Sequence, residues 1–243
     1  MSKTIVLIHG YGFDSRIWSP VELAFDGYHT IYLALPGFGE DPVEKSYTIE
    51  ELAASLWSEI DPNIAPFVHL VGHSMGGYVC MEMLAQQPER VLSLALIHSH
   101  VYADTEEGKS SRTLAMNNIK TLGSVVQAKK MIPSLFDKTH PLENVIELLI
   151  RRGLTHGDNA WYFGMGAMRD RKDHSETLRT TSIPVLMIVG EKDVAVPLEI
   201  AYRQAPLVSH GVLCVYPDVG HMAMYENTGQ LICDLAGFYS VLA

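Results

Sequence analysis

The chain has 243 residues, of which 47% are hydrophobic, 9% aromatic and 19% charged. This apolar fraction is typical of a globular protein and too high for a disordered chain. The 18 Lys and Arg residues against 28 Asp and Glu residues leave a formal net charge of −10. Because so acidic a chain repels phosphate backbones, and no basic patch is evident in the sequence, we expect no nucleic-acid partner.

The three cysteines, Cys80, Cys214 and Cys233, are an odd number without close spacing. They predict neither a zinc site nor a disulfide framework, so we expect a reducing compartment and a cytoplasmic location. The apolar run at residues 4–8 is too short for a signal peptide. No apolar stretch in the sequence reaches the ~18 residues of a membrane span, so we expect no membrane partner.

Short apolar runs rich in β-branched residues alternate along the chain with longer helical patterns. Most of the runs are continuous, as expected for parallel strands that are covered on both faces. The predicted strands are residues 4–8, 29–34, 67–71, 92–97, 185–189 and 212–216. Strands and helices in alternation predict an α/β fold, with a mainly parallel, doubly wound sheet of six strands.

Several helices between these strands carry their own signals. Thr48 and Glu51 form a T-x-x-E capping box, and apolar residues follow at helical spacing through residues 49–60. A second helix is predicted over residues 75–87, where Pro88 ends it. A C-terminal helix has one apolar face, made of Leu231, Leu235, Phe238 and Tyr239.

The interval between the fourth and fifth strands differs from the rest of the chain. It contains no good strand pattern, and its helical patterns cover residues 113–122, 125–132, 142–152 and 158–171. Because strands continue on both sides, we predict that residues 99–182 form a helical lid inserted before the fifth strand. Residues 1–98 and 183–243 then form the core.

The strongest local signal is Gly72-His73-Ser74-Met75-Gly76, a G-x-S-x-G motif between an apolar strand and an amphipathic helix. A serine on such a sharp turn has a strained backbone, and its hydroxyl projects above the sheet. The neighbouring positions must be small because helix and strand pass close together. The motif therefore predicts Ser74 as a nucleophile. The alternative is a glycine-rich turn whose serine only caps the helix.

A serine nucleophile needs a base, and the base needs an orienting carboxylate. In this arrangement the acid and then the histidine follow the serine, each after a later strand. Asp193 lies in the turn after the fifth predicted strand, and His221 follows the sixth. We predict Asp193 as the acid and His221 as the base. The alternatives are a solvated loop histidine and an exposed turn aspartate, with Glu191 or Asp218 as competing acids.

A carbonyl group attacked by serine also needs donors for its developing negative charge. The backbone N–H of Met75 lies at a helix N-terminus, where the helix dipole favours an anion. The second donor is expected in the loop after the first strand, where Gly10 and Gly12 allow the N–H of Tyr11 to turn inward. The alternative is a plain glycine-rich turn.

The predicted lid is rich in methionine and aromatic residues, which suit an adaptable apolar pocket wall. Trp161 and Met165 in this segment, and Met222 beside the candidate base, are the predicted pocket residues. His98 and His100 end the fourth strand, but no carboxylate or cysteine lies at ligand spacing. We therefore favour a packing or supporting role for them and expect no metal site.

Together with Leu35-Pro36-Gly37-Phe38-Gly39 after the second strand and Gly220-His221-Met222 near the end, these motifs make the chain similar to α/β-hydrolase serine hydrolases. The resemblance covers residues 4–98 and 183–243. Most members begin with two further antiparallel strands, which are not expected here.

The compact start resembles the plant methyl esterase and hydroxynitrile lyase branch of the superfamily. Its lyases carry a threonine and a lysine where this chain has Gly10 and Met222, as the esterases do. Dehalogenases and epoxide hydrolases of the fold use an aspartate where this chain has Ser74. The resemblance therefore favours the methyl esterase or carboxylesterase branch.

The resemblance implies an enzyme that cleaves carboxylic esters of small, largely apolar substrates through an acyl-enzyme. Ser74, Asp193 and His221 form its triad, and the N–H groups of Tyr11 and Met75 form its oxyanion hole. The open alternatives are a thioesterase, a perhydrolase or haloperoxidase, a C–C bond hydrolase, and a small-ligand receptor. No cofactor is expected, and the chain is expected to be a monomer or a homodimer.

Overall fold

The computed structural model describes residues 4–139 and 141–242. In this part of the chain six strands form one sheet in the order β2-β1-β3-β4-β5-β6, and all neighbouring strands are parallel. The strands are β1 (Thr4–Ile8), β2 (His29–Leu33), β3 (Val68–His73), β4 (Val91–Ile97), β5 (Val185–Gly190) and β6 (Gly211–Tyr216). The predicted sheet of six strands is confirmed, with small differences at the strand ends.

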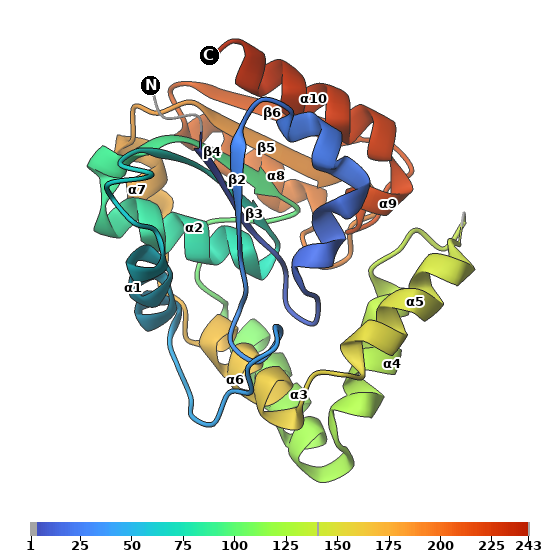
Figure 1. Cartoon of the computed structure of the whole chain (residues 1–243). Coiled ribbons are helices and arrows are strands. Elements are labelled where there is room, and N and C mark those ends of the chain that lie inside the picture. Colours follow the sequence, from blue (N-terminus) through green and yellow to red (C-terminus); the bar gives the residue numbers. More distant parts are fainter. Residues whose placement is uncertain (1–3, 140, 243) are drawn as a thin grey trace.

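Helices cover both faces of the sheet. On one face α1 packs against α2, and on the other α10 packs against the 3₁₀ helix η1 (Figure 1). The helical elements around the sheet are η1 (Ser15–Phe25), α1 (Ile49–Glu59), α2 (Met75–Gln86), η2 (Pro88–Arg90), α8 (Leu198–Gln204), η3 (Ala205–Leu207), α9 (Ala223–Glu226) and α10 (Thr228–Ser240). The sequence pattern did not predict η1, which contains Pro20 and lacks the α-helical hydrogen-bond pattern.

The burial of the strands explains their composition. Every residue of β1, β3 and β5 is buried, whereas the edge strands β2 and β6 are partly exposed. Strands covered by helices on both faces need apolar residues at successive positions, not at alternate ones. Because the strands are parallel, the residues that follow β3, β4, β5 and β6 meet at one edge of the sheet.

The capping box at the start of α1 is confirmed. Thr48 Oγ1 accepts the N–H of Glu51 across 3.0 Å, and Glu51 Oε2 accepts the N–H of Thr48 across 2.9 Å. Two N–H groups at the helix start thereby obtain acceptors, which sets where the helix begins.

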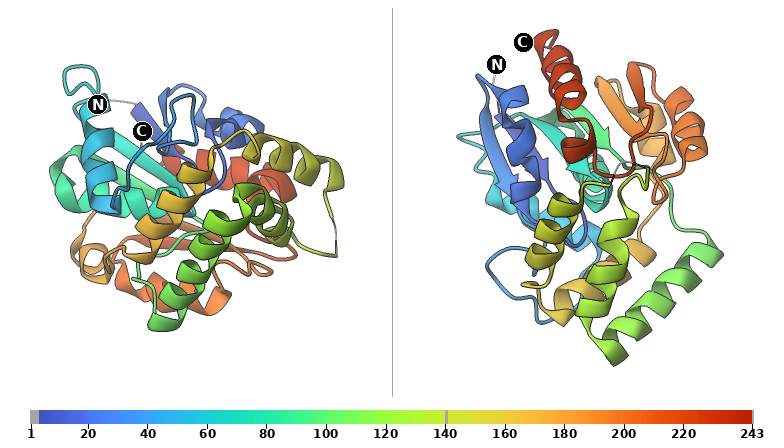
Figure 2. Two further views of the ribbon diagram at one scale, coloured as in Figure 1. Left: turned by 90° about the horizontal axis from the view of Figure 1, so that it is seen from below. Right: turned by 90° about the vertical axis from the view of Figure 1, so that its right-hand side faces the viewer.

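A series of helices occupies the chain between β4 and β5: α3 (Glu106–Leu122), α4 (Ser124–Ser134), α5 (Glu143–Gly153), α6 (Asp158–Arg169) and α7 (Ser175–Thr180). Helix α3 packs against α4 and α6, and this group lies beyond one edge of the sheet (Figures 1 and 2), while α7 returns to α2. Helix α3 begins earlier than the sequence pattern indicates, because Thr105 Oγ1 accepts the N–H of Gly108. No helix within residues 4–139 and 141–242 combines the length and apolar character needed to cross a bilayer.

Candidate active site

Ser74 lies between β3 and α2 in a backbone conformation that residues other than glycine rarely adopt, with φ 52° and ψ −117°. The glycines around it are required by close contacts between backbones. A Cβ atom on Gly76 would lie 2.1 Å from the carbonyl oxygen of Ile8, and one on Gly72 would lie 2.5 Å from Cα of Gly77. The strained turn and the close approach of helix and strand are those that the G-x-S-x-G motif predicts.

Asp193 and His221, which follow β5 and β6, meet at the same edge. Nδ1 of His221 lies 2.7 Å from Oδ2 of Asp193, and both side chains are buried. Oδ1 of Asp193 accepts the N–H groups of Ala195 and Val196 across 2.8 and 2.9 Å. Burial by itself would raise the pKa of Asp193, but the charges of the His221 and His98 imidazoles and their hydrogen bonds to the carboxylate hold it below its ordinary value. Asp193 is therefore an anion.

The competing acids weighed from the sequence are exposed and do not reach His221. Asp218 is exposed in a turn with φ 54°, and Glu191 is exposed beside Lys192. Neither makes a hydrogen bond to His221 within the described residues.

A second imidazole binds the same carboxylate oxygen. Nδ1 of His98 lies 2.9 Å from Oδ2 of Asp193, and its ring is fully buried. Nε2 of His98 accepts the N–H of Ala223 across 3.4 Å, so Nδ1 carries the proton and donates to Asp193. His98 does not line the cavity that contains Ser74, and both its nitrogens are occupied. It is therefore a supporting residue for Asp193, in keeping with the role favoured from the sequence.

Two residues that sequence analysis did not identify hold the backbone around His221. The carboxylate of Glu226 accepts the N–H of Gly220 across 3.1 Å and the N–H of Met222 across 2.9 Å. His73 Nε2 donates to the carbonyl oxygen of His221 across 3.0 Å. Burial lowers the pKa of His73 well below its ordinary value, so this donor is a neutral imidazole. Neither residue belongs to a recognisable motif for this role, because both act through backbone groups and not through a side chain of the predicted site.

The two predicted oxyanion donors flank the serine. A Cβ atom on Gly10 would lie 3.2 Å from Cβ of Ser74, so the loop that carries Tyr11 passes directly beside Ser74. Met75 is the first residue of α2, where N–H groups have no partner within the helix. In the part of the chain that the structure describes, the N–H groups of Tyr11 and Met75 make no hydrogen bond to another group.

Ser74 and His221 line one cavity of about 130 Å³, here called the serine cavity. From the sheet side it is lined by Tyr11, Phe13, Ser74, Tyr78, Ala195, Val196 and His221. From the helical segment it is lined by Arg112, Met131, Leu135, Met165 and Met168. Apart from Ser74, His221 and Arg112, the wall consists of aromatic rings and apolar side chains.

Of the three predicted pocket residues, Met165 lines the serine cavity, whereas Trp161 and Met222 do not. Trp161 is fully buried and packs edge-to-face on Tyr11, with ring centroids 5.1 Å apart. Its carbonyl oxygen accepts the hydroxyl of Tyr11 across 2.6 Å. Met222 is fully buried beside His221. Trp161 therefore supports a cavity residue instead of contacting a bound molecule.

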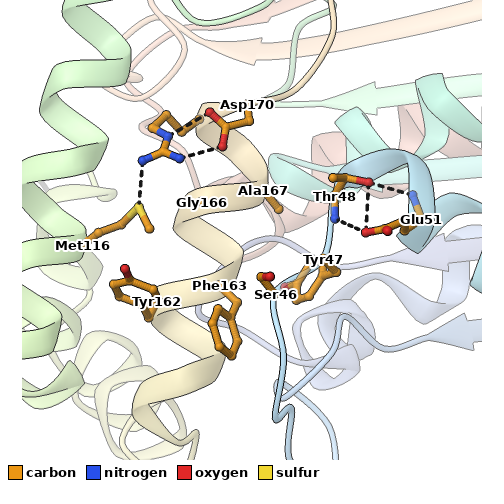
Figure 3. A pocket seen from close by; sticks show the side chains of 11 residues that line it. Ser46, Tyr47, Thr48, Glu51, Met116, Tyr162, Phe163, Gly166, Ala167 and Asp170 are labelled. Carbon is orange, nitrogen blue, oxygen red and sulfur yellow. Dashed lines mark hydrogen bonds and ion pairs between the residues drawn. The ribbon is translucent and has the colours of Figure 1, made fainter.

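A larger open groove of about 570 Å³ lies between α3, α6 and the start of α1, and shares no lining residue with the serine cavity (Figure 3). Its charged side chains are paired with neighbouring residues. Arg169 pairs with Asp170 across 2.7 Å, and Glu51 is held by the capping box with Thr48. The groove therefore offers no free base for a nucleophile.

The side chains of His98, Asp193 and His221 are also the candidate ligands for a metal ion. Their ligand atoms lie within 4.8 Å of one another. Both Nδ1 atoms, however, approach a single oxygen of Asp193 at 2.7 and 2.9 Å, which are the distances of charge-assisted hydrogen bonds. We therefore interpret this group as a hydrogen-bonded carboxylate with two imidazole donors.

The model of the family described as "Alpha/beta hydrolase family" matches residues 5–235. The chain belongs to the alpha/beta hydrolase family. A thermophilic esterase from Thermogutta terrifontis has the same fold as this alpha/beta hydrolase, with a TM-score of 0.90 and 25% identity. The match covers 100% of this chain and 91% of that one.

Among curated proteins, this alpha/beta hydrolase is 28% identical to a 2-hydroxy-6-oxononadienedioate/2-hydroxy-6-oxononatrienedioate hydrolase of Klebsiella pneumoniae, over 93% of this chain and 83% of that one. It is 27% identical to the acetyltransferase component of an acetoin cleaving system of Cupriavidus necator, over 94% of this chain and 61% of that one. The chain spans about half to three fifths of the length of this and two other curated relatives. With esterases and hydrolases among its relatives, the alpha/beta hydrolase is an enzyme.

Proposed function

We propose that this enzyme hydrolyses small carboxylic esters through a triad of Ser74, His221 and Asp193. The observation that carries the proposal is that His221, bonded to Asp193 across 2.7 Å, lines the same cavity as the strained Ser74. Nδ1 of His221 is occupied by Asp193, so Nε2 is the nitrogen that accepts a proton. A serine, a base and an anchored carboxylate in this order are the parts that acyl transfer needs.

In the proposed reaction Ser74 Oγ attacks the ester carbonyl while His221 Nε2 takes the hydroxyl proton. Asp193 holds the imidazole in one tautomer and stabilises the imidazolium. The N–H groups of Tyr11 and Met75 bind the oxyanion, and each donor contributes about 3 kcal/mol to the transition state. His221 then protonates the leaving alcohol, the carbon–oxygen bond breaks, and an acyl-enzyme remains. Water, deprotonated by His221, hydrolyses this intermediate and restores the serine.

We also propose that residues 99–182 act as a lid over a core formed by residues 1–98 and 183–243. The support is that the serine cavity has one wall from the core and one from this segment, including Arg112, Met131 and Met165. A wall of this kind excludes water from the reaction and selects the acyl and alcohol groups that fit.

The test is the Ser74→Ala variant assayed with p-nitrophenyl acetate and p-nitrophenyl butyrate. We expect kcat to fall by at least about a thousandfold, while the circular dichroism spectrum stays that of the wild type. Ser58→Ala on α1 is the matched control, because this serine is exposed and bonds only to Ser55. Retention of most activity in Ser74→Ala would refute the proposal. Labelling of the wild type, but not of Ser74→Ala, by a fluorophosphonate tests the nucleophile independently.

The same assay separates the alternatives. A panel of oxygen esters, thioesters, peroxide and a vinylogous 1,5-diketone distinguishes ester cleavage from the other reactions that a serine triad supports. A receptor would turn over every member of the panel slowly and would gain stability on ligand binding.

A further inference from the structure

The serine cavity contains a cation that ester hydrolysis itself does not require. Arg112, on α3, is the only permanently charged side chain among the described residues that line this cavity. Its Nε donates to Oδ2 of Asp104. Among the described residues its Nη1 approaches two thioether sulfurs, Sδ of Met165 at 3.6 Å and Sδ of Met168 at 3.5 Å, and no oxygen.

Thioether sulfurs are weak acceptors, whereas a guanidinium normally binds oxygen atoms with several of its N–H groups. Within residues 4–139 and 141–242, neither Nη atom of Arg112 has an oxygen acceptor. The side chain is 23% exposed, so its donors are partly withdrawn from water. A ligand oxygen in the cavity would supply the acceptors that the protein does not.

Asp104 neutralises Arg112 only in part, because its carboxylate also pairs with a second arginine. Arg171 Nη1 lies 2.6 Å from Oδ1 of Asp104. Arg171 is almost fully buried and also donates to the carbonyl oxygens of Tyr102 and Met168, so its donors are occupied. Two guanidinium groups therefore share one carboxylate, which leaves a net positive charge on this group of side chains, and Arg112 is the member that lines the cavity.

The state of His100 agrees with a positive potential in this wall. Burial lowers the pKa of His100 to about 3, and the charges of Arg171, Arg112 and Arg203 act in the same direction, against Asp104 alone. His100 is therefore neutral and cancels no charge. This region is positive although the chain as a whole carries a formal net charge of −10.

We propose that Arg112 binds a carboxylate of the substrate, so that the preferred substrates are monoesters of short dicarboxylic acids. This inference rests on the proposed ester hydrolysis at Ser74. A guanidinium whose Nη groups have no oxygen acceptor among the described residues fits a carboxylate better than any neutral group of similar size. The volume of about 130 Å³ limits the acyl chain to a few carbon atoms, with the ester at Ser74 and the carboxylate at Arg112.

The test compares monomethyl succinate with methyl butyrate, which have acyl chains of equal length, by titration of released acid. We expect the wild type to prefer monomethyl succinate in kcat/KM by at least about tenfold. In Arg112→Gln the ratio of the two kcat/KM values should fall by at least about tenfold, and Arg112→Lys should restore part of it. Arg169→Gln is the matched control, because Arg169 pairs with Asp170 outside the cavity, and its ratio should equal that of the wild type.

The wild type alone gives a second measurement that does not depend on a variant folding. Added sodium chloride should weaken kcat/KM for monomethyl succinate more than for methyl butyrate, because salt screens the pairing of carboxylate and guanidinium. A wild-type preference for methyl butyrate, or equal salt dependence for both esters, would overturn the inference. An unchanged ratio in Arg112→Gln would do the same.

Binding of succinate, measured by calorimetry, separates this inference from the proposed function. The wild type should bind succinate at least about tenfold more tightly than Arg112→Gln. One outcome is that Ser74→Ala abolishes ester turnover while the wild type and Arg112→Gln bind succinate equally. The proposed carboxylate site is then wrong and the hydrolase proposal stands. If no ester is hydrolysed but succinate binds only with Arg112 present, the hydrolase proposal fails and the carboxylate site stands.

Discussion

His98 donates a hydrogen bond to Oδ2 of Asp193 across 2.9 Å, deep in the interior. His98 also has φ 49°, a conformation that asparagine tolerates better than most side chains. Because the same oxygen accepts Nδ1 of His221, the two imidazoles together determine where the carboxylate lies. In the proposed mechanism His98 therefore acts through Asp193, without contact with a substrate.

Replacement of His98 by leucine should therefore lower kcat and leave KM nearly unchanged. A hydrogen bond to a charged group contributes about 1.5–3 kcal/mol, which corresponds to a loss of about 10- to 100-fold in kcat. His98→Asn keeps an N–H near the position of Nδ1 and should recover most of the loss. Steady-state kinetics on p-nitrophenyl butyrate measure the effect. Equal kcat values in the leucine and asparagine variants would show that only packing matters at this position.

Glu226 holds the loop of His221 through the N–H groups on either side of it. In Glu226→Gln the amide has one accepting oxygen, and its NH₂ group faces a backbone donor. We expect the free energy of unfolding to fall by about 2–3 kcal/mol, and kcat to fall as the loop loosens. Urea denaturation and steady-state kinetics test this. Glu22→Gln, at an exposed site, is the control. An equal loss of unfolding free energy in both variants would show that the hydrogen bonds of Glu226 to this loop do not contribute.

Replacement of glycine by alanine should have opposite effects on stability at two positions. A Cβ on Gly76 would lie 2.1 Å from the oxygen of Ile8, so α2 and β1 must separate and Gly76→Ala should lose about 3 kcal/mol of stability. Gly237, in the exposed part of α10, has no atom within 4 Å of the added Cβ. Gly237→Ala should raise stability by about 0.5–1 kcal/mol. Thermal unfolding of both variants measures the difference, and destabilisation by Gly237→Ala would contradict the assigned geometry.

The free energy of unfolding should decrease as the pH decreases, because His100 is buried in its neutral form. Burial lowers its pKa from 6.5 to about 3, so between these values the unfolded chain binds a proton that the folded chain does not. The free energy of unfolding therefore falls as the pH falls, by about 1.4 kcal/mol per pH unit for this residue. Buried His9, with a pKa of about 4, acts in the same direction.

Urea denaturation at a series of pH values below neutrality measures this slope. His100→Gln should make it shallower by about 1.4 kcal/mol per pH unit, since the titrating group is removed. His29→Gln, at an exposed position, should leave the slope unchanged. The same slope in the wild type and in His100→Gln would exclude His100 as a cause of the pH dependence of stability.

The sheet and the meeting of Ser74, Asp193 and His221 at its edge follow from local patterns. Continuous apolar runs identify strands covered on both faces, and parallel strands necessarily bring the residues after them to one edge. The G-x-S-x-G motif carries its own geometric reason, since Gly76 touches the backbone of β1. These features depend on neighbours in the sequence or on one spacing rule, so a single sequence is enough to predict them.

The walls of the serine cavity depend on contacts between distant segments. The sequence pattern places Trp161 and Met165 on one helix, but not the direction of that helix relative to the sheet. Packing of α6 against α3 turns Met165 into the cavity and Trp161 against Tyr11. Periodicity shows which residues share a helix face, not which partner that face meets.

The amino-acid sequence thus determines the strands, the capping box at Thr48 and the sharp turn at Ser74, because each arises from short-range sterics and hydrogen bonds. The second donor to Asp193 and the sharing of Asp104 by Arg112 and Arg171 arise only when segments distant in the sequence come together. Each of these depends on distances between atoms far apart in the chain, and those distances are set by packing of the whole molecule.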